Sequence, residues 1–205
     1  MPFHEKCALL HYWLARFRLG AIDPARVLSE PKPALVEVGT TASFFCRGDG
    51  NPMPQMIWLR NNRTLTQTHG SRYIPITARI GLSSLRIEPT RVRDNNTMIT
   101  CLVDNGIGQV FSETKLVVYS KDDLKLGFPR VVLQPRLKAV EIGFRSLMTC
   151  EYSGDPKPSI TWLHNHLPLD VPRNPLINLK DDQEARGEHF IIVLNQSRHA
   201  NITRE

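Results

Sequence analysis

Hydrophobic residues along this chain occur in short runs that turn-forming residues separate. Between Leu82 and Ile87, apolar residues alternate with Ser and Arg, and this period of two predicts a half-buried edge strand. Clusters of Gly, Pro, Asn and Asp bound the other runs, and no long helical pattern follows the N-terminal segment. Short strands with frequent turns favour an all-β sandwich. The predicted strands cover residues 42–46, 56–59, 82–87, 99–103, 110–119, 147–150 and 159–163.

The same pattern occurs twice, at a constant spacing of 104 positions, so that Cys46 corresponds to Cys150 and Trp58 to Trp162. The other matching pairs are Val36-Glu37-Val38-Gly39 with Val140-Glu141-Ile142-Gly143, and Gly50-Asn51-Pro52-Met53-Pro54 with Gly154-Asp155-Pro156-Lys157-Pro158. A repeat of this length without gaps predicts two tandem domains. We place the first domain at residues 24–120, a linker at 121–127 and the second domain at 128–205.

Residues 1–23 precede the first domain and have no role that the sequence reveals. The run from Cys7 to Phe17 is the one candidate targeting element, but His11 and Arg16 interrupt its apolar character. We interpret the segment as a short helix or a stray N-terminus, with a degraded secretion signal as the alternative. No stretch reaches the roughly 18 apolar residues that span a bilayer, so we expect a membrane anchor to lie outside these residues.

Cys46, Trp58 and Cys101 identify the type of sandwich. A Cys, a Trp twelve residues later and a second Cys 55 residues after the first are the pattern of an immunoglobulin-like domain, here of the I-set. We therefore predict a Cys46–Cys101 disulfide with Trp58 packed against it in the core, and Trp162 in the core of the second domain. Such a bridge persists in an oxidising compartment. Two buried free thiols in a cytosolic domain are the alternative.

The second copy of the pattern has Cys150 and Trp162 but no later cysteine. A comparable interval places the partner of Cys150 at or just beyond Glu205. We therefore expect Cys150 to be unpaired and the second domain to lack its last strands. We also expect that domain to be unstable or to associate through its open sheet edge.

A formal net charge of +6 favours an anionic partner. The chain has no finger spacing, RNP pattern or helix-turn-helix rhythm, so we expect no nucleic acid. A sulfated polysaccharide suits an extracellular basic surface better. His164-Asn165-His166 is the closest group of histidines, but without a third ligand we predict a solvated loop and no metal.

Catalytic motifs are missing from this sequence. A tyrosine phosphatase needs a thiolate in a C-x5-R loop, and none of the four cysteines has arginine six positions later. No Walker loop, nucleophile elbow or carboxylate constellation occurs either. We predict neither enzyme activity nor a cofactor for these residues.

Several segments are similar to one receptor family. These are Leu85-Arg86-Ile87-Glu88-Pro89, Asn105-Gly106-Ile107-Gly108, Leu126-Gly127-Phe128-Pro129-Arg130, Gln134-Pro135-Arg136-Leu137-Lys138-Ala139-Val140-Glu141, Leu167-Pro168-Leu169-Asp170, and Gly154 to Trp162. Over residues 24–205 the chain resembles the first two immunoglobulin domains of the LAR family of receptor-type protein tyrosine phosphatases. The resemblance implies the extracellular part of a single-pass plasma-membrane receptor that binds heparan or chondroitin sulfate proteoglycans and cell-surface adhesion proteins, in axon guidance or synapse organisation. An adhesion protein with immunoglobulin repeats and no phosphatase is the alternative.

The family's lysine-rich loop after the first-domain tryptophan is here Arg60-Asn61-Asn62-Arg63-Thr64, so less positive charge is present than in the family, while Arg72 and Arg91 stand at matching basic positions. The basic residues that remain are Arg60, Arg63, Arg72 and Arg91. We predict that they form one face that binds glycosaminoglycan, because a guanidinium donates two parallel hydrogen bonds to one sulfate. A solvated surface without a specific polyanion is the alternative. The family's tyrosine two residues before the second cysteine is Ile99 here, so we expect the tyrosine-corner hydrogen bond to be absent.

Four N-x-S/T sequons predict glycosylation at Asn62, Asn95, Asn195 and Asn201. A glycan on Asn62 would obstruct the predicted basic face. Arg47-Gly48-Asp49 spells an integrin tripeptide, but it directly follows the core cysteine. We therefore expect it to continue a strand instead of projecting on a loop.

Overall fold

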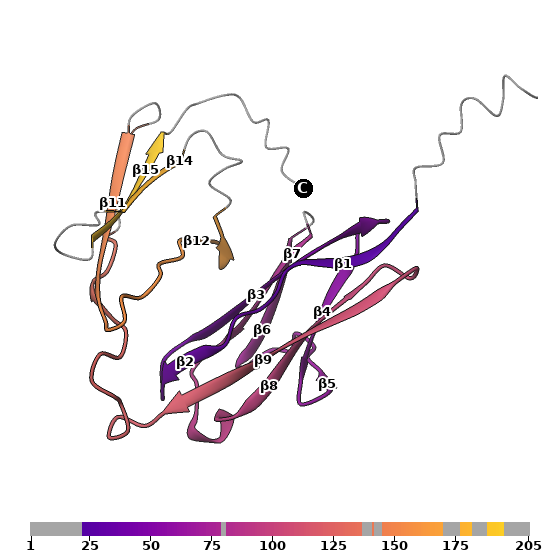
Figure 1. The fold of residues 1–205 in the computed structure, drawn as a ribbon, viewed down its shortest axis with the longest axis horizontal. Helices are drawn as coiled ribbons and strands as arrows, with labels where there is room; N and C mark the ends of the chain where they lie inside the picture. Colours follow the sequence, from indigo (N-terminus) through magenta and orange to yellow (C-terminus); the bar gives the residue numbers. More distant parts are fainter. Residues whose placement is uncertain are drawn as a thin grey trace, which may run out of the picture. The chain divides into compact units, whose positions relative to one another are not determined.

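The structure, a computed structural model, describes residues 22–78, 81–136, 141, 145–169, 177–181 and 188–194. The chain divides into two compact units between Tyr119 and Ser120. Figure 1 shows that the described regular elements of both units are strands, apart from one short 3-10 turn. No helix among the described residues is long and apolar enough to cross a bilayer.

The first unit is a sandwich of two sheets (Figure 1). One sheet has the order β1-β3-β7-β6 and the other the order β2-β9-β8-β4-β5, in which β2 and β9 are parallel. This arrangement confirms the predicted all-β immunoglobulin-like fold. The elements are β1 (Asp23–Ser29), β2 (Ala34–Glu37), β3 (Ala42–Asn51), β4 (Gln55–Arg60), β5 (Arg63–Thr64), β6 (Tyr73–Ala78), β7 (Leu82–Ile87), the 3-10 turn η1 (Val92–Asp94), β8 (Thr97–Asp104) and β9 (Gln109–Tyr119).

Between the sheets lies the predicted core. Cys46 on β3 and Cys101 on β8 form a disulfide, and the Trp58 side chain is 1% exposed. Trp58 pairs with Cys101 in the strand register, and its Nε1 donates to Ser83 Oγ in the opposite sheet at 2.9 Å. The disulfide and the Trp58 core position are confirmed. Closing a loop of this length stabilises the fold by about 4 kcal/mol through loop entropy.

The residues of β7 were predicted with the correct bounds but in the wrong place in the sheet. This strand lies between β3 and β6, so it is an interior strand and not an edge. The polar residues that gave the alternation are small enough to be buried: Ser83 and Ser84 have almost no exposed surface. Ser83 Oγ also donates to the Ile76 carbonyl at 3.0 Å, which satisfies the hydroxyl inside the sandwich.

At one end of the sandwich, Asn105 connects three segments of the first unit. Its Nδ2 donates to the Asp23 carbonyl at 2.8 Å and to the Pro52 carbonyl at 3.1 Å. Its Oδ1 accepts from the backbone nitrogens of Ala25, at 3.2 Å, and Gly108, at 2.9 Å. One amide side chain therefore holds the start of β1 and the β3–β4 turn against the β8–β9 turn.

The second unit has a four-stranded sheet of order β10-β11-β15-β14, the same arrangement as β1-β3-β7-β6, and a separate hairpin, β12-β13. Cys150 on β11 is buried and unpaired, as predicted, and burial raises the pKa of its thiol. The elements are β10 (Arg130–Leu133), β11 (Arg145–Ser153), β12 (Leu163–His164), β13 (Leu167–Pro168), β14 (Ile177–Asp181) and β15 (Glu188–Leu194).

Two predictions for the second unit were wrong. The strand expected at 159–163 is present only at β12, which begins at Leu163. Trp162 is half-buried, not a core residue, and the neighbouring Leu163 is 42% exposed. The physical reason is the pairing, because within the described residues β12 bonds only to β13 and no disulfide-bearing strand covers the indole.

Candidate anion-binding site

The site begins at the β4–β5 hairpin of the first unit. Arg60 and Arg63 are cross-strand partners on either side of a two-residue turn. The turn residues Asn61 and Asn62 have φ values of 46° and 64°, and asparagine tolerates this left-handed conformation better than most residues. Asn61 exchanges two hydrogen bonds with the Met98 backbone, each 3.0 Å long. The hairpin is therefore fixed to β8, and its two arginines are neighbours.

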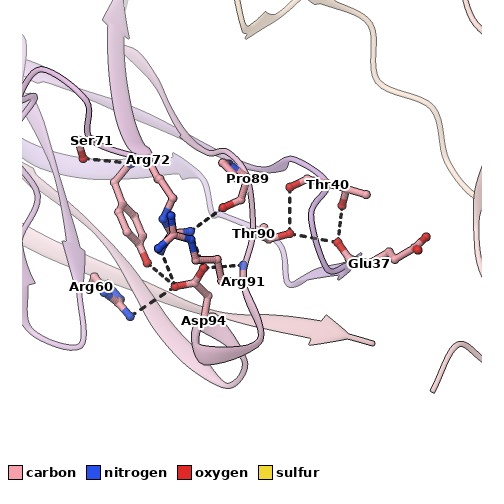
Figure 2. Close-up of polar contacts among 10 residues, drawn as sticks. Glu37, Thr40, Arg60, Ser71, Arg72, Pro89, Thr90, Arg91 and Asp94 are labelled. Atoms are coloured by element: carbon pink, nitrogen blue, oxygen red, sulfur yellow. Dashed lines mark hydrogen bonds and ion pairs between the residues drawn. The ribbon is translucent and has the colours of Figure 1, made fainter. Parts of the chain in front are cut away.

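Asp94, the last residue of η1, lies at the centre of the site (Figure 2). Arg72 forms a bidentate pair with this carboxylate, with Nη–Oδ distances of 2.7 and 3.1 Å. The Tyr73 hydroxyl and the Arg91 backbone nitrogen donate to it at 2.8 and 2.9 Å. Arg60 Nη2 lies 3.6 Å from Oδ1. The carboxylate is fully buried and satisfied from four directions.

These contacts decide the charge state of the carboxyl group. Burial alone would raise the pKa of Asp94, but hydrogen bonds from Arg72, Tyr73 and the Arg91 backbone outweigh it and lower the pKa to about 2. Burial also raises the pKa of Tyr73, and the bond to Asp94 adds to that shift. Asp94 is therefore an anion at neutral pH, and Tyr73 is a neutral donor.

Arg60 is held from the inner side and open on the outer side. Its guanidinium carbon lies 5.0 Å from the Tyr73 ring centroid, a cation–π contact, and its side chain is 34% exposed. A pocket of about 500 Å³ lies outside it, lined by Arg60, Asn61, Arg63 and Leu65. The Arg60 Nε is buried and has no hydrogen-bond partner within the described residues. The pocket thus presents two cations to solvent.

The structure brings Arg60, Arg72 and the Arg91 backbone onto Asp94, places Arg63 beside Arg60 across the hairpin, and gives the four side chains different environments. Arg63 and Arg91 are exposed, and Arg60 is half-buried. The Arg72 side chain is only 13% exposed, with its guanidinium bonded to Asp94 and to the Pro89 carbonyl at 2.6 Å. Arg72 therefore supports the face from inside and does not present a free cation to a ligand. Exposed Arg93, in η1, is a further cation that the sequence analysis did not select.

Asp94 itself was missed, together with the tyrosine that binds it. Ile99 is fully buried and has no hydroxyl, so this position makes no tyrosine-corner hydrogen bond, as predicted. A tyrosine from β6 replaces it, because the Tyr73 hydroxyl binds Asp94 in the β7–β8 connection. An acidic residue within the basic run Arg91-Val92-Arg93-Asp94 was the one available signal.

The other predicted sites have these positions. Asn62 and Asn95 are exposed, whereas Asn195 and Asn201 lie outside the described residues. His164 and His166 belong to the β12–β13 hairpin, and no group of metal-binding side chains occurs within the described ranges. The Arg47-Gly48-Asp49 tripeptide lies within β3, as predicted, with Asp49 paired to Arg26.

Comparison with known proteins agrees with the immunoglobulin-like fold. The immunoglobulin I-set domain family matches residues 25–118. The chain is 40% identical to a Lar-like tyrosine-protein phosphatase of Caenorhabditis elegans over 73% of its length, and 34% identical to Lar of Drosophila melanogaster over 93%. A crystal structure of the N-terminal Ig1-2 module of the Drosophila receptor DLAR superposes with a TM-score of 0.70 at 33% identity, covering 87% of this chain and 86% of that one. The chain belongs to the LAR family of receptor tyrosine phosphatases.

The match to LAR receptors falls on their immunoglobulin region, which is extracellular. The chain spans 7% of the length of the Caenorhabditis relative and 10% of the Drosophila relative. It is therefore an extracellular immunoglobulin adhesion module of this family, and no phosphatase domain is matched.

Proposed function

We propose that this LAR-family module binds sulfated glycosaminoglycan, heparan or chondroitin sulfate, at the Arg60–Arg63 pocket, with Arg91 extending the contact. The observation that carries the proposal is the paired arrangement of Arg60 and Arg63 around an open pocket, with Arg60 fixed by Tyr73 and Asp94. Two arginines that share a pocket suit the multiple anionic oxygens of a sulfated chain.

Charge supports the choice of a polyanion. Asp94 carries one negative charge, which Arg72 already neutralises in a bidentate pair, so the more distant contact of Arg60 with Asp94 leaves the pocket, with Arg60 and Arg63, positively charged. Arg60 is also held before any ligand arrives, which reduces the entropy lost on binding.

The remaining part of the proposal follows the family: the module contributes to recognition of cell-surface adhesion proteins in axon guidance or synapse organisation, as the extracellular part of a single-pass receptor phosphatase.

Heparin-affinity chromatography of the full chain, with the Asn62 sequon removed by Thr64→Ala, tests the proposal. We expect elution well above the physiological ionic strength of about 0.15 M. Arg63→Glu and Arg91→Glu should each shift elution to lower salt, and the double variant should shift it further. Lys32→Glu is the matched control, because Lys32 is exposed in the β1–β2 connection and the charge change is the same.

Two outcomes would contradict the anion site. Elution of the Thr64→Ala chain below physiological salt would mean that the basic face is only solvated. An equal shift for Lys32→Glu and Arg63→Glu would mean that net charge, not the pocket, retains the protein on the column.

A further inference from the structure

Asn62 occupies the tip of the hairpin that carries the pocket. It is the second residue of the turn, it is exposed, and among the described residues its amide makes no hydrogen bond. The residues on both sides of it in the turn region, Asn61 and Arg63, line the pocket. A group attached to the Asn62 amide would therefore begin at the rim of the pocket.

The sequon at this position is fully exposed. The hydroxyl-bearing residue of Asn62-Arg63-Thr64 lies on the edge strand β5, and Thr64 is exposed. The Asn95 sequon differs, because Asn95 Oδ1 accepts from the Val118 backbone nitrogen at 3.0 Å and Thr97 is only 3% exposed. The folded first unit thus presents one sequon whose asparagine amide and threonine are both unengaged.

We propose that Asn62 carries an N-linked oligosaccharide and that this glycan closes the Arg60–Arg63 pocket to sulfated polysaccharide. The proposal rests on the proposed function of that pocket and assigns its regulation: the fraction of chains glycosylated at Asn62 sets the affinity for glycosaminoglycan. Attachment joins Asn62 Nδ2 to the anomeric carbon of an oligosaccharide from a lipid pyrophosphate donor. The lipid pyrophosphate leaves, and the amide loses one proton.

Steric exclusion follows from the covalent connectivity. Arg63 is both a pocket residue and the middle residue of the sequon, so a polysaccharide that contacts Arg63 must pass within one residue of the attachment point. The hairpin itself does not need the Asn62 side chain, because Asn61 makes the bonds to β8. A bulky substituent on Asn62 is therefore compatible with the fold and incompatible with a chain lying across the pocket.

The experiment uses the full chain secreted from eukaryotic cells. Peptide mass mapping measures glycan occupancy at Asn62, and heparin binding is measured for the parent, Thr64→Ala and Thr64→Ser. Thr64→Ala removes the sequon without changing the turn residues, whereas Thr64→Ser retains it as the matched control. We expect a glycan on the parent and on Thr64→Ser, none on Thr64→Ala, and heparin affinity at least tenfold higher for Thr64→Ala.

The outcomes distinguish failure of the proposed glycan regulation from failure of the anion site itself. An unmodified Asn62 in the secreted parent would overturn the proposal that a glycan closes the pocket. Equal heparin affinities of the parent and Thr64→Ala would also overturn the glycan regulation, as long as adding Arg63→Glu to Thr64→Ala still weakens binding. If Arg63→Glu leaves the affinity of Thr64→Ala unchanged, the anion site itself is wrong, whatever the glycan occupancy.

Discussion

The two units contain the same hairpin at equivalent positions, β4–β5 in the first and β12–β13 in the second. The turn residues have matching left-handed φ values, 46° and 64° for Asn61 and Asn62, and 50° and 65° for Asn165 and His166. The residue after each hairpin bonds back to the tryptophan carbonyl, Leu65 to Trp58 at 2.8 Å and Leu169 to Trp162 at 2.9 Å. The turn conformation, the strand pairing and the bond back to the tryptophan carbonyl are thus the same in the two hairpins.

The side chains and neighbours of these hairpins are not repeated. Arg60 and Arg63 flank the first turn, whereas His164 and Leu167 flank the second. In the first unit β4 also pairs with β8, which brings the disulfide onto Trp58; within the described part of the second unit β12 has only β13 as a partner. The comparison shows that turn residues encode the hairpin locally, while burial and charge depend on the strands packed beside it.

The largest expected difference between the units concerns the two tryptophans. Trp58→Ala should destabilise the first unit by about 3–5 kcal/mol, because it leaves a cavity beside the disulfide. Trp162→Ala should cost clearly less in the second unit, because Trp162 is only half-buried. Hydrogen exchange of the full chain, followed on peptides from β3 and β11, measures both. Equal losses would contradict the difference in burial.

Removing the central carboxylate should affect only the first unit. Asp94→Ala leaves the guanidinium of Arg72 buried without its counter-charge, which typically costs about 3–5 kcal/mol. Peptides from β7 and β8 should exchange faster, while peptides from β11 serve as an internal control. A loss below about 1 kcal/mol would mean that the network around Asp94 contributes little to stability.

The same carboxylate should give the first unit its acid sensitivity. The pKa of Asp94 is lowered from 3.8 to about 2 in the folded chain, so its stabilising contribution is complete above pH 4 and is lost as the pH falls through 2. The shift corresponds to about 2 kcal/mol. Urea denaturation followed by circular dichroism should therefore show the parent and Asp94→Asn converging by about this amount between pH 5 and pH 2. A constant difference would show that Asp94 titrates normally.

The smallest expected effect concerns the two hairpin turns. It separates the cost of the turn conformation, which both units share, from the cost of the contact that only Asn61 makes. The positive φ at both positions should contribute about 1 kcal/mol to the destabilisation by Asn61→Ala and by Asn165→Ala. Asn61→Ala should cost about 1 kcal/mol more, since Asn61 Oδ1 also accepts from Met98 N. Asn61→Gly avoids the φ strain, so it should lose only the hydrogen bond from Met98 N. The hydrogen-exchange rate of the Met98 amide measures the loss of this bond, and an unchanged rate in Asn61→Gly would contradict the Asn61–Met98 hydrogen bond.

Local sequence signals were sufficient for much of this fold. The Cys46–Cys101 bridge and the core position of Trp58 follow from spacing, because the immunoglobulin sandwich fixes that geometry. The Asp94 network did not follow, because its partners Arg72 and Tyr73 are more than twenty positions away and only the packed sheets bring them together. From the sequence, the four selected arginines look like one basic face. Only the folded structure shows that buried Asp94 pairs with Arg72 and so removes it from that face.

The Asn105 junction has a consequence for chemical ageing. Asparagine followed by glycine deamidates when the glycine nitrogen attacks the side-chain carbonyl carbon, and Asn105-Gly106 is such a pair. Here the Gly106 nitrogen donates to Asp104 Oδ1 at 2.8 Å, and the Asn105 amide is held by the carbonyls of Asp23 and Pro52. The folded unit therefore protects Asn105 from deamidation, and an aspartate formed there in an unfolded chain would lack the two donors that hold the start of the first strand and the β3–β4 turn in place.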